Sequence, residues 1–332
     1  MRTVLSLALA ALVLAPPLVA ALASPALPEE GPDVPAATAP VATVTVLDHE
    51  QFSYTAGYRG HNVSVPAGPW NRVVLVWEQK PVDDPWDRTF SASIGGVEVL
   101  RGTTPRAEFT VQKDVTRYAS LLPAGGIAMV EGYADSWVGA GQLVTLTLQF
   151  YDDPSAAAVQ PAATHVFGIQ RMAGMSIGSQ TGPSAVDFGA TAPSSASVEF
   201  IASGHGDQED WFIYPESPPK FTLLVDGTPV ATAVAMPYTY AFFGVCSGPG
   251  CTGTSTDQTV ATAMWWTAQR GADLAGVHQG VGEIPAYRAV VAPGDLHLLQ
   301  GAHNVTVLLD RDALGDADGS GVWITSASIL TQ

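Results

Sequence analysis

The stretch Val144-Thr145-Leu146-Thr147-Leu148-Gln149-Phe150 decides the fold, because apolar and polar residues alternate along it without a break. Successive side chains of a strand point to opposite faces, so this pattern predicts a strand with one buried face. Similar runs rich in Val, Thr and aromatic residues cover residues 72–77, 90–94, 97–100, 128–130, 198–202, 221–225, 229–234, 305–309 and 322–330. Gly and Pro separate these runs, and we find no long run with helical spacing, so the sequence predicts an all-β protein of antiparallel sandwiches.

The length of the chain indicates two domains. Its 332 residues are too many for one ordinary core. We expect an N-terminal sandwich over residues 44–155 and a C-terminal sandwich over residues 156–332, with a hinge near residues 152–161. Acids outnumber bases by 31 to 14, which gives a formal charge of −17. A surface of this charge repels phosphate backbones and disfavours nucleic acid as a partner.

Residues 1–23 are typical of a secretory signal peptide. An apolar run extends from Leu5 to Leu14 behind a positively charged start, and Ala21-Leu22-Ala23 fits a cleavage site. An uncleaved anchor is the alternative, although Pro16-Pro17 interrupts the apolar run. Residues 24–43 are rich in Ala and Pro and are typical of a linker. We therefore expect a secreted or extracytoplasmic protein whose mature chain has no membrane span.

The sequence predicts one disulfide and neither a metal site nor a cofactor. Cys246 and Cys251 flank a Ser-Gly-Pro-Gly turn, and such a pair in an exported chain favours a small disulfide loop. The seven His residues show no paired metal-ligand spacing. Residues Asp316 and Asp318 resemble the start of a calcium loop, but the twelfth position is not a glutamate, so a plain turn is the alternative.

Each half of the chain repeats one unit, in which a strand leads into a loop with an acid beside a tryptophan and then into a hairpin. The loops are Pro85-Trp86-Asp87-Arg88 and Ser203-Gly204-His205-Gly206-Asp207-Gln208-Glu209-Asp210-Trp211. The hairpin turns are Gly95-Gly96 and Asp226-Gly227, which suit tight two-residue turns. If the halves pack as related sandwiches, the two acidic loops meet at the domain interface, where pockets often form.

The same loops resemble a known family. The segments that carry the resemblance in the first half are Arg72-Val73-Val74-Leu75 leading through Trp86-Asp87-Arg88, residues 96–105, residues 113–118 and Leu121-Leu122. The segments that carry it in the second half are Ser203-Gly204-His205-Gly206, Glu209-Asp210-Trp211-Phe212 and the pair Trp266 and Arg270. From about residue 65 to the C-terminus, the sequence resembles the peptide-N-glycosidase F and plant peptide-N-glycosidase A amidases.

The resemblance implies two jelly-roll domains packed side by side, with an active site in the cleft between them. It implies metal-free hydrolysis of the β-aspartyl-glucosaminyl amide of N-glycosylated proteins or glycopeptides. The products are the released glycan and a peptide with Asp in place of Asn.

The resemblance also implies three catalytic acids. The principal acid of the family corresponds to Asp87, and the acid of the second domain corresponds to Glu209. A further family glutamate corresponds to Glu131, with Tyr133 at the position of a family aromatic residue. The cysteines that flank the second acid in the bacterial enzyme are absent, so Asp210 is the alternative for Glu209.

Amide hydrolysis needs a base that activates water and a donor for the leaving nitrogen. We expect Asp87 to deprotonate the water, Glu209 to hold the amide nitrogen, and Arg270 to polarise the carbonyl. Arg88 either favours an ionised Asp87 or binds the substrate. The side chains expected to pack against sugar faces are Trp86, Tyr133, Trp137 and Trp211. His205 either contacts the substrate or belongs to a turn.

Two other functions fit the sequence. One is a non-catalytic jelly-roll pair that binds glycans or a surface partner, since this fold serves lectins as well as enzymes. The other is a glycoside hydrolase that uses the same two acids to break a bond between sugars. Product analysis separates them, because only the amidase converts Asn to Asp.

Overall fold

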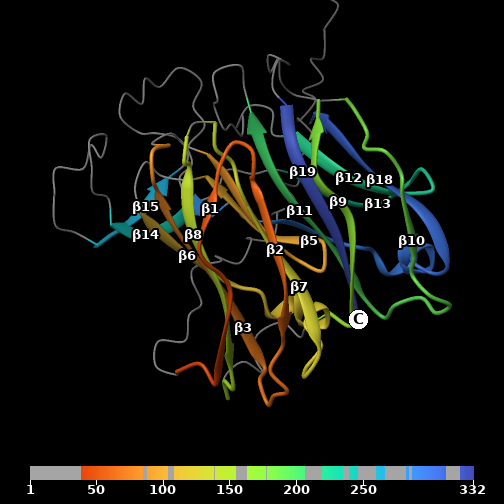
Figure 1. Ribbon diagram of the computed structural model, residues 1–332. Helices are drawn as coiled ribbons and strands as arrows, with labels where there is room; N and C mark the ends of the chain where they lie inside the picture. Colours follow the sequence, from red (N-terminus) through yellow and green to blue (C-terminus); the bar gives the residue numbers. More distant parts are fainter. Residues whose placement is uncertain are drawn as a thin grey trace, which may run out of the picture.

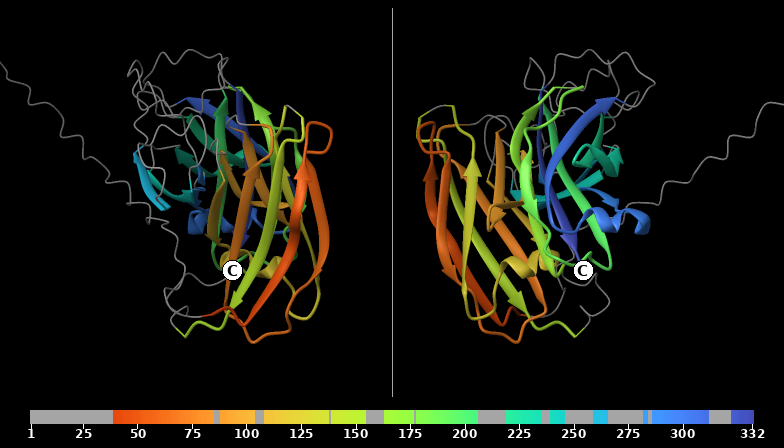
Figure 2. Two further views of the ribbon diagram at one scale, coloured as in Figure 1. Left: turned by 60° about the vertical axis from the view of Figure 1, so that its left-hand side comes forward. Right: turned by 90° about the vertical axis from the view of Figure 1, so that its right-hand side faces the viewer.

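The structure is a computed structural model. It describes residues 39–84, 88–103, 108–137, 139–154, 163–176, 178–205, 219–234, 239–245, 259–265, 282–283, 286–311 and 322–332. These residues form four antiparallel sheets that make two sandwiches, and the sandwiches lie side by side (Figure 1). The views in Figure 2 show the same two blocks from other sides, with the first half of the chain in red to yellow and the second in green to blue.

The first sandwich has an outer sheet of six strands and an inner sheet of five. The order of the outer sheet is β1 (Ala42–Phe52), β8 (Gln142–Tyr151), β3 (Arg72–Pro81), β6 (Phe109–Asp114), β14 (Thr239–Val245) and β15 (Thr259–Trp265). The order of the inner sheet is β16 (Gly282–Glu283), β5 (Val97–Thr103), β4 (Thr89–Ile94), β7 (Ile127–Ala134) and β2 (Tyr58–Ser64).

The second sandwich has two sheets of four strands. The order of its inner sheet is β17 (Tyr287–Val290), β11 (Ala196–His205), β19 (Val322–Thr331) and β9 (His165–Met175). The order of its outer sheet is β10 (Ser184–Asp187), β18 (Ala302–Arg311), β12 (Pro219–Val225) and β13 (Thr228–Val234). Among the described residues the helical segments are the short 3-10 turns η1 (Thr116–Leu121) and η3 (Pro293–Leu298), and no helix there is long and apolar enough to cross a bilayer.

The alternation that predicted the fold is present in β8. Val144, Leu146, Leu148 and Phe150 are buried in the first core, while the residues between them are partly exposed. A separate core fills the second sandwich around Phe200 and other buried side chains from both of its sheets. Two separate cores follow from a chain that is too long for one.

Both predicted hairpin turns have the expected geometry. In the first hairpin Ile94 pairs with Val97 across Gly95-Gly96, whose φ angles are 58° and 80°. In the second, Asp226 and Gly227 have φ angles of 47° and 81°. Two consecutive residues with positive φ are typical of a type I′ turn, which explains why glycine and aspartate occupy these positions.

Three strands from late in the chain join the first sandwich. Phe243 and Gly244 of β14 pair with β6, and β15 pairs with β14 at the edge of that sheet. Gly282 and Glu283 of β16 pair with β5 on the opposite sheet. The chain therefore crosses to the first sandwich after β13 and returns for β17, a crossover that a single division near residue 155 does not describe.

Candidate functional site

The two inner sheets meet face to face, and polar side chains lie among those between them. Along β4, the side chains of Phe90, Ala92 and Ile94 point into the first core, so Ser91 and Ser93 point toward the second sandwich. Along β11, the side chains of Val198, Phe200 and Ala202 point into the second core, so Glu199 and Ser203 point toward the first sandwich. All four polar side chains are buried, so the interface between the sandwiches holds polar groups out of water beside apolar ones such as Ile201, which shares the face of Glu199 and Ser203.

Glu131 of β7 lies at this interface, where the resemblance implies the active site. Its Oε2 atom accepts a hydrogen bond from Nη1 of Arg171 in β9 at 2.7 Å and one from the Ser93 hydroxyl at 3.4 Å. Both charged side chains are about a quarter exposed. Because Arg171 belongs to the second sandwich, Glu131 is a carboxylate that both sandwiches position.

Tyr133 lies two residues further along the same face of β7. Its ring centroid is 4.5 Å from that of Tyr58 in the neighbouring strand β2. Burial raises the pKa of the Tyr133 phenol, and the negative charge of Asp135 raises it further. The phenol therefore keeps its proton at physiological pH and remains a hydrogen-bond donor.

Asp135 is a third polar side chain at this end of β7, and the sequence analysis did not consider it. Burial raises the pKa of its carboxyl group, while the indole N–H of Trp137, at 2.8 Å from Oδ2, and the charge of Arg88 lower it. The alternating positions 131, 133 and 135 are the signal that could have identified this residue, because alternate residues of a strand share a face.

The raised pKa of Asp135 predicts a pH dependence of stability. The folded protein binds this proton more tightly than the unfolded chain, so the free energy of unfolding falls as the pH rises above the ordinary value of 3.8. Below that value the carboxyl group is neutral in both states. The Asp135→Asn variant should therefore gain stability relative to the wild type as the pH rises from about 3.8, measured as the difference in urea midpoint. A difference that is constant with pH would show that Asp135 does not titrate in this way.

Arg88, which the sequence analysis linked to Asp87, is paired with another carboxylate. Its Nε lies 2.9 Å from Oδ2 of Asp84, and both side chains are buried. The Ser136 hydroxyl and the Trp137 backbone N–H donate to the same oxygen. The guanidinium group also lies 4.7 Å from the centre of the Trp137 ring. Asp84 and Arg88 thus form a buried ion pair on either side of residues 85–87.

The described residues bring four of the predicted site residues together on β7 and around its end, namely Arg88, Glu131, Tyr133 and Trp137. His205 is the last residue of β11, where its backbone pairs with Val322. The following predicted residues lie outside the described residues: Trp86, Asp87, Glu209, Asp210, Trp211, Arg270, Cys246, Cys251, Asp316, Asp318 and the whole of residues 1–38. Within the described part of the chain, no three His, Cys, Asp or Glu side chains are arranged to hold a metal ion.

The described residues thus form an all-β protein of two adjacent jelly-roll sandwiches, with Glu131 at the interface and Tyr133 beside it on β7. The chain belongs to the family described as peptide N-acetyl-beta-D-glucosaminyl asparaginase amidase A, which matches residues 28–241. The fold class and the family expected from the sequence are both confirmed.

Individual relatives agree with this family. A protein from Prunus dulcis, peptide-N4-(N-acetyl-beta-glucosaminyl)asparagine amidase A, is 36% identical over 88 residues, which are 23% of this chain and only 15% of the relative. A recombinant peptide:N-glycanase F has a TM-score of 0.57 and 14% identity, and the match covers 88% of this chain and 95% of that one. PNGase F from Flavobacterium meningosepticum, a glycosylasparaginase, has a TM-score of 0.56 and 13% identity over the same shares. At these identities the structural likeness shows the fold.

Proposed function

We propose that the protein hydrolyses the β-aspartyl-glucosaminyl amide of N-glycosylated proteins or glycopeptides, which releases the glycan and converts Asn to Asp. One observation carries this proposal: the family match over residues 28–241 includes Asp87, Glu131 and Glu209. The position of Glu131 between the two sandwiches supports it, because the family's active site is expected there.

Each of these groups has a separate role in the proposed reaction. Asp87 deprotonates the attacking water and returns that proton to the leaving nitrogen, which Glu209 holds, so that the C–N bond breaks after the new C–O bond has formed. Glu131, oriented by Arg171, accepts a hydrogen bond from the substrate or from that water. The phenol of Tyr133 donates its proton to Asp135, so its oxygen accepts a hydrogen bond from a sugar hydroxyl or the amide N–H, and Arg270 polarises the carbonyl. None of these steps calls for a cofactor.

The proposed activity fits an exported protein. Residues 1–23 would direct export and be removed, and Cys246 would bond to Cys251 in the oxidising compartment that follows. N-glycosylated substrates would then meet the enzyme outside the cytoplasm.

Incubation of the purified full chain with a defined N-glycopeptide in heavy-oxygen water tests the proposal. We expect mass spectrometry to show Asp with one heavy oxygen at the former glycan site and the intact glycan in solution. The same peptide without glycan is the matched control and should stay unchanged. A glycopeptide that is bound without a mass change would support the glycan-binding alternative, and cleavage between two sugars would support a glycoside hydrolase. Either result would overturn the amidase.

A further inference from the structure

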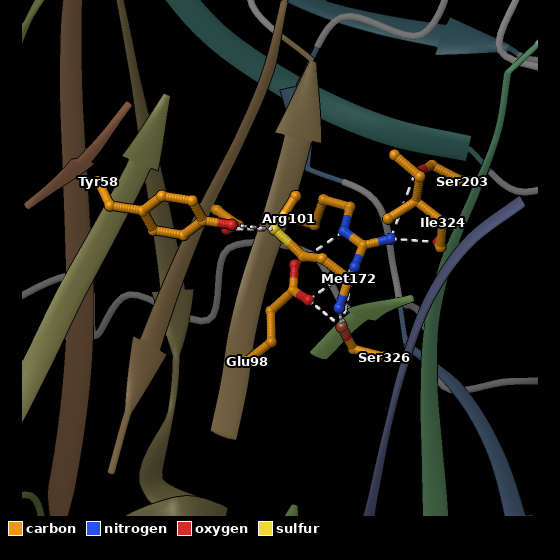
Figure 3. A network of polar contacts seen from close by, with 8 residues as sticks. Tyr58, Glu98, Arg101, Met172, Ser203, Ile324 and Ser326 are labelled. Atoms are coloured by element: carbon orange, nitrogen blue, oxygen red, sulfur yellow. Dashed lines mark hydrogen bonds and ion pairs between the residues drawn. The ribbon is translucent and has the colours of Figure 1, made fainter. Parts of the chain in front are cut away.

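A buried arginine connects the two inner sheets at a point that the proposed chemistry does not use. The interface arginine cluster consists of Arg101 and Glu98 from β5, Ser203 from β11, and the Ile324 carbonyl and Ser326 hydroxyl from β19 (Figure 3). The side chains of Arg101 and Glu98 are both 0% exposed. Such a pair loses all of its hydration on folding. This loss is costly unless hydrogen bonds to the surrounding groups compensate for it.

The contacts of Arg101 are complete. Its Nε and Nη2 atoms donate to the two oxygens of Glu98 at 2.7 Å and 2.6 Å, a bidentate pair within β5. The other contacts reach the second sandwich: Nη2 donates to the Ser326 hydroxyl at 2.9 Å, and Nη1 donates to the Ser203 hydroxyl at 3.3 Å and to the Ile324 carbonyl. A guanidinium group has five N–H donors, and here all five have acceptors. A lysine in this place could not reproduce that planar fork.

The cluster connects several strands of the second sandwich. Ser203 and Ile324 are register partners in β11 and β19, so Arg101 binds both strands at one rung of the sheet. The Ser326 hydroxyl also accepts a hydrogen bond from the backbone N–H of Met172 in β9 at 2.8 Å. One side chain from the first sandwich therefore contacts two strands of the second directly and a third through Ser326.

The strands that meet at the cluster carry the candidate site. In the first sandwich Arg101 pairs with Ser91 of β4, and β4 begins at Thr89, directly after Arg88. In the second sandwich Ser203 lies two residues before His205, where β11 ends. At about 3.3 Å per residue, the cluster is about 10 Å from Arg88 along β4 and about 7 Å from His205 along β11.

We propose that Arg101 is a positioning residue, which holds the site-bearing ends of β4 and β11 in one fixed relation across the domain interface. This inference rests on the proposed amidase function, because it assigns a role in that reaction. Arg101 itself is not proposed to contact the substrate. Its effect on the reaction comes from the alignment of groups that two different sandwiches supply, and small misalignments of such groups are costly.

The same interface offers a matched control. Glu199 of β11 is buried on the same face as Ser203, four residues or about 13 Å further from the end of the strand. Its carboxylate accepts a hydrogen bond from Arg117 Nη1 of η1 at 2.6 Å and one from the Tyr118 hydroxyl, and it pairs with Arg288 at 2.8 Å. The Arg117→Met variant loosens the domain interface there, while Arg288 still pairs with Glu199.

The test compares Arg117→Met with the double variant Glu98→Met/Arg101→Met in the full chain. Replacing both charges by apolar side chains of similar volume leaves no buried unpaired charge, so the double variant is expected to fold. Glycopeptide kinetics are measured well below the thermal midpoint of each variant. We expect the kcat of the double variant to fall at least about ten-fold with KM within about two-fold, and the kcat of Arg117→Met to stay within about two-fold of the wild type.

The positioning role would be overturned if the double variant kept the wild-type kcat, or if both variants lost kcat equally. A merely structural contact lowers stability without a selective loss of kcat. Hydrogen exchange provides a readout that does not depend on activity. Faster exchange at residues 203–205 in the double variant alone supports the inference, and unchanged exchange there overturns it. If the wild type itself does not cleave the glycopeptide, the proposed function fails, and the exchange measurement still decides whether Arg101 positions β11.

Discussion

Asp87→Asn is expected to lower the rate of glycopeptide deamidation by about 10²–10⁴-fold, the range that a general base contributes to catalysis. Asparagine has nearly the same shape as aspartate, but it cannot take a proton from water. The rate is measured by mass spectrometry as conversion of Asn to Asp under saturating substrate. The thermal midpoint should stay close to that of the wild type, because the substitution changes the charge and leaves the volume almost unchanged.

Asp152→Asn makes the same chemical change at an exposed carboxylate directly after β8, a strand of the outer sheet of the first sandwich. It should retain the full wild-type rate. If Asp87→Asn remains as active as Asp152→Asn, then Asp87 is not the base, and the carboxylates to examine next are Glu131 and Asp135. Both lie on one face of β7 and its extension, where Glu131 contacts Arg171 of the second sandwich and Asp135 contacts Trp137.

The pattern of apolar, polar and turn-forming residues along the sequence predicted most of the fold. Strands such as β8 were predicted because alternating burial is a property of neighbouring residues, which the sequence displays directly. The hairpins at Gly95-Gly96 and Asp226-Gly227 were predicted because positive φ selects particular residues. The crossing of β14 and β16 to the first sandwich was missed, because alternation identifies a strand without identifying its partner.

The candidate site was predicted less completely, for a related reason. The resemblance to the family identified Glu131 and Tyr133, and both lie at the domain interface. Arg171, which orients Glu131, is 40 residues away in the sequence and belongs to the other sandwich. The contact between Arg101 and Ser203 spans 102 residues. Contacts of this kind depend on how two sheets face each other, and the spacing of residues in the sequence does not show how the sheets face.

The Asp84→Ala variant is expected to lose about 3–5 kcal/mol of unfolding free energy, the usual cost of removing one partner of a buried ion pair. The carboxylate of Asp84 is fully buried and accepts hydrogen bonds from Arg88 at 2.9 Å, from the Ser136 hydroxyl at 3.0 Å and from the Trp137 N–H at 3.1 Å. Alanine leaves Arg88 buried without this carboxylate and leaves two other donors without this acceptor. Urea denaturation of the full chain measures the loss.

Asp48→Ala is the matched control, because Asp48 pairs with His49 while 78% of each side chain is exposed. An exposed pair of this kind contributes little, so the urea midpoint should not change measurably. The Asp84 prediction is wrong if its loss is below about 1 kcal/mol, the range of an exposed pair. In that case Arg88 would be satisfied without Asp84, and its guanidinium group would be free to serve the site, as the sequence first indicated. A loss of the expected size instead shows that Asp84 and Arg88 stabilise the first sandwich as a buried ion pair.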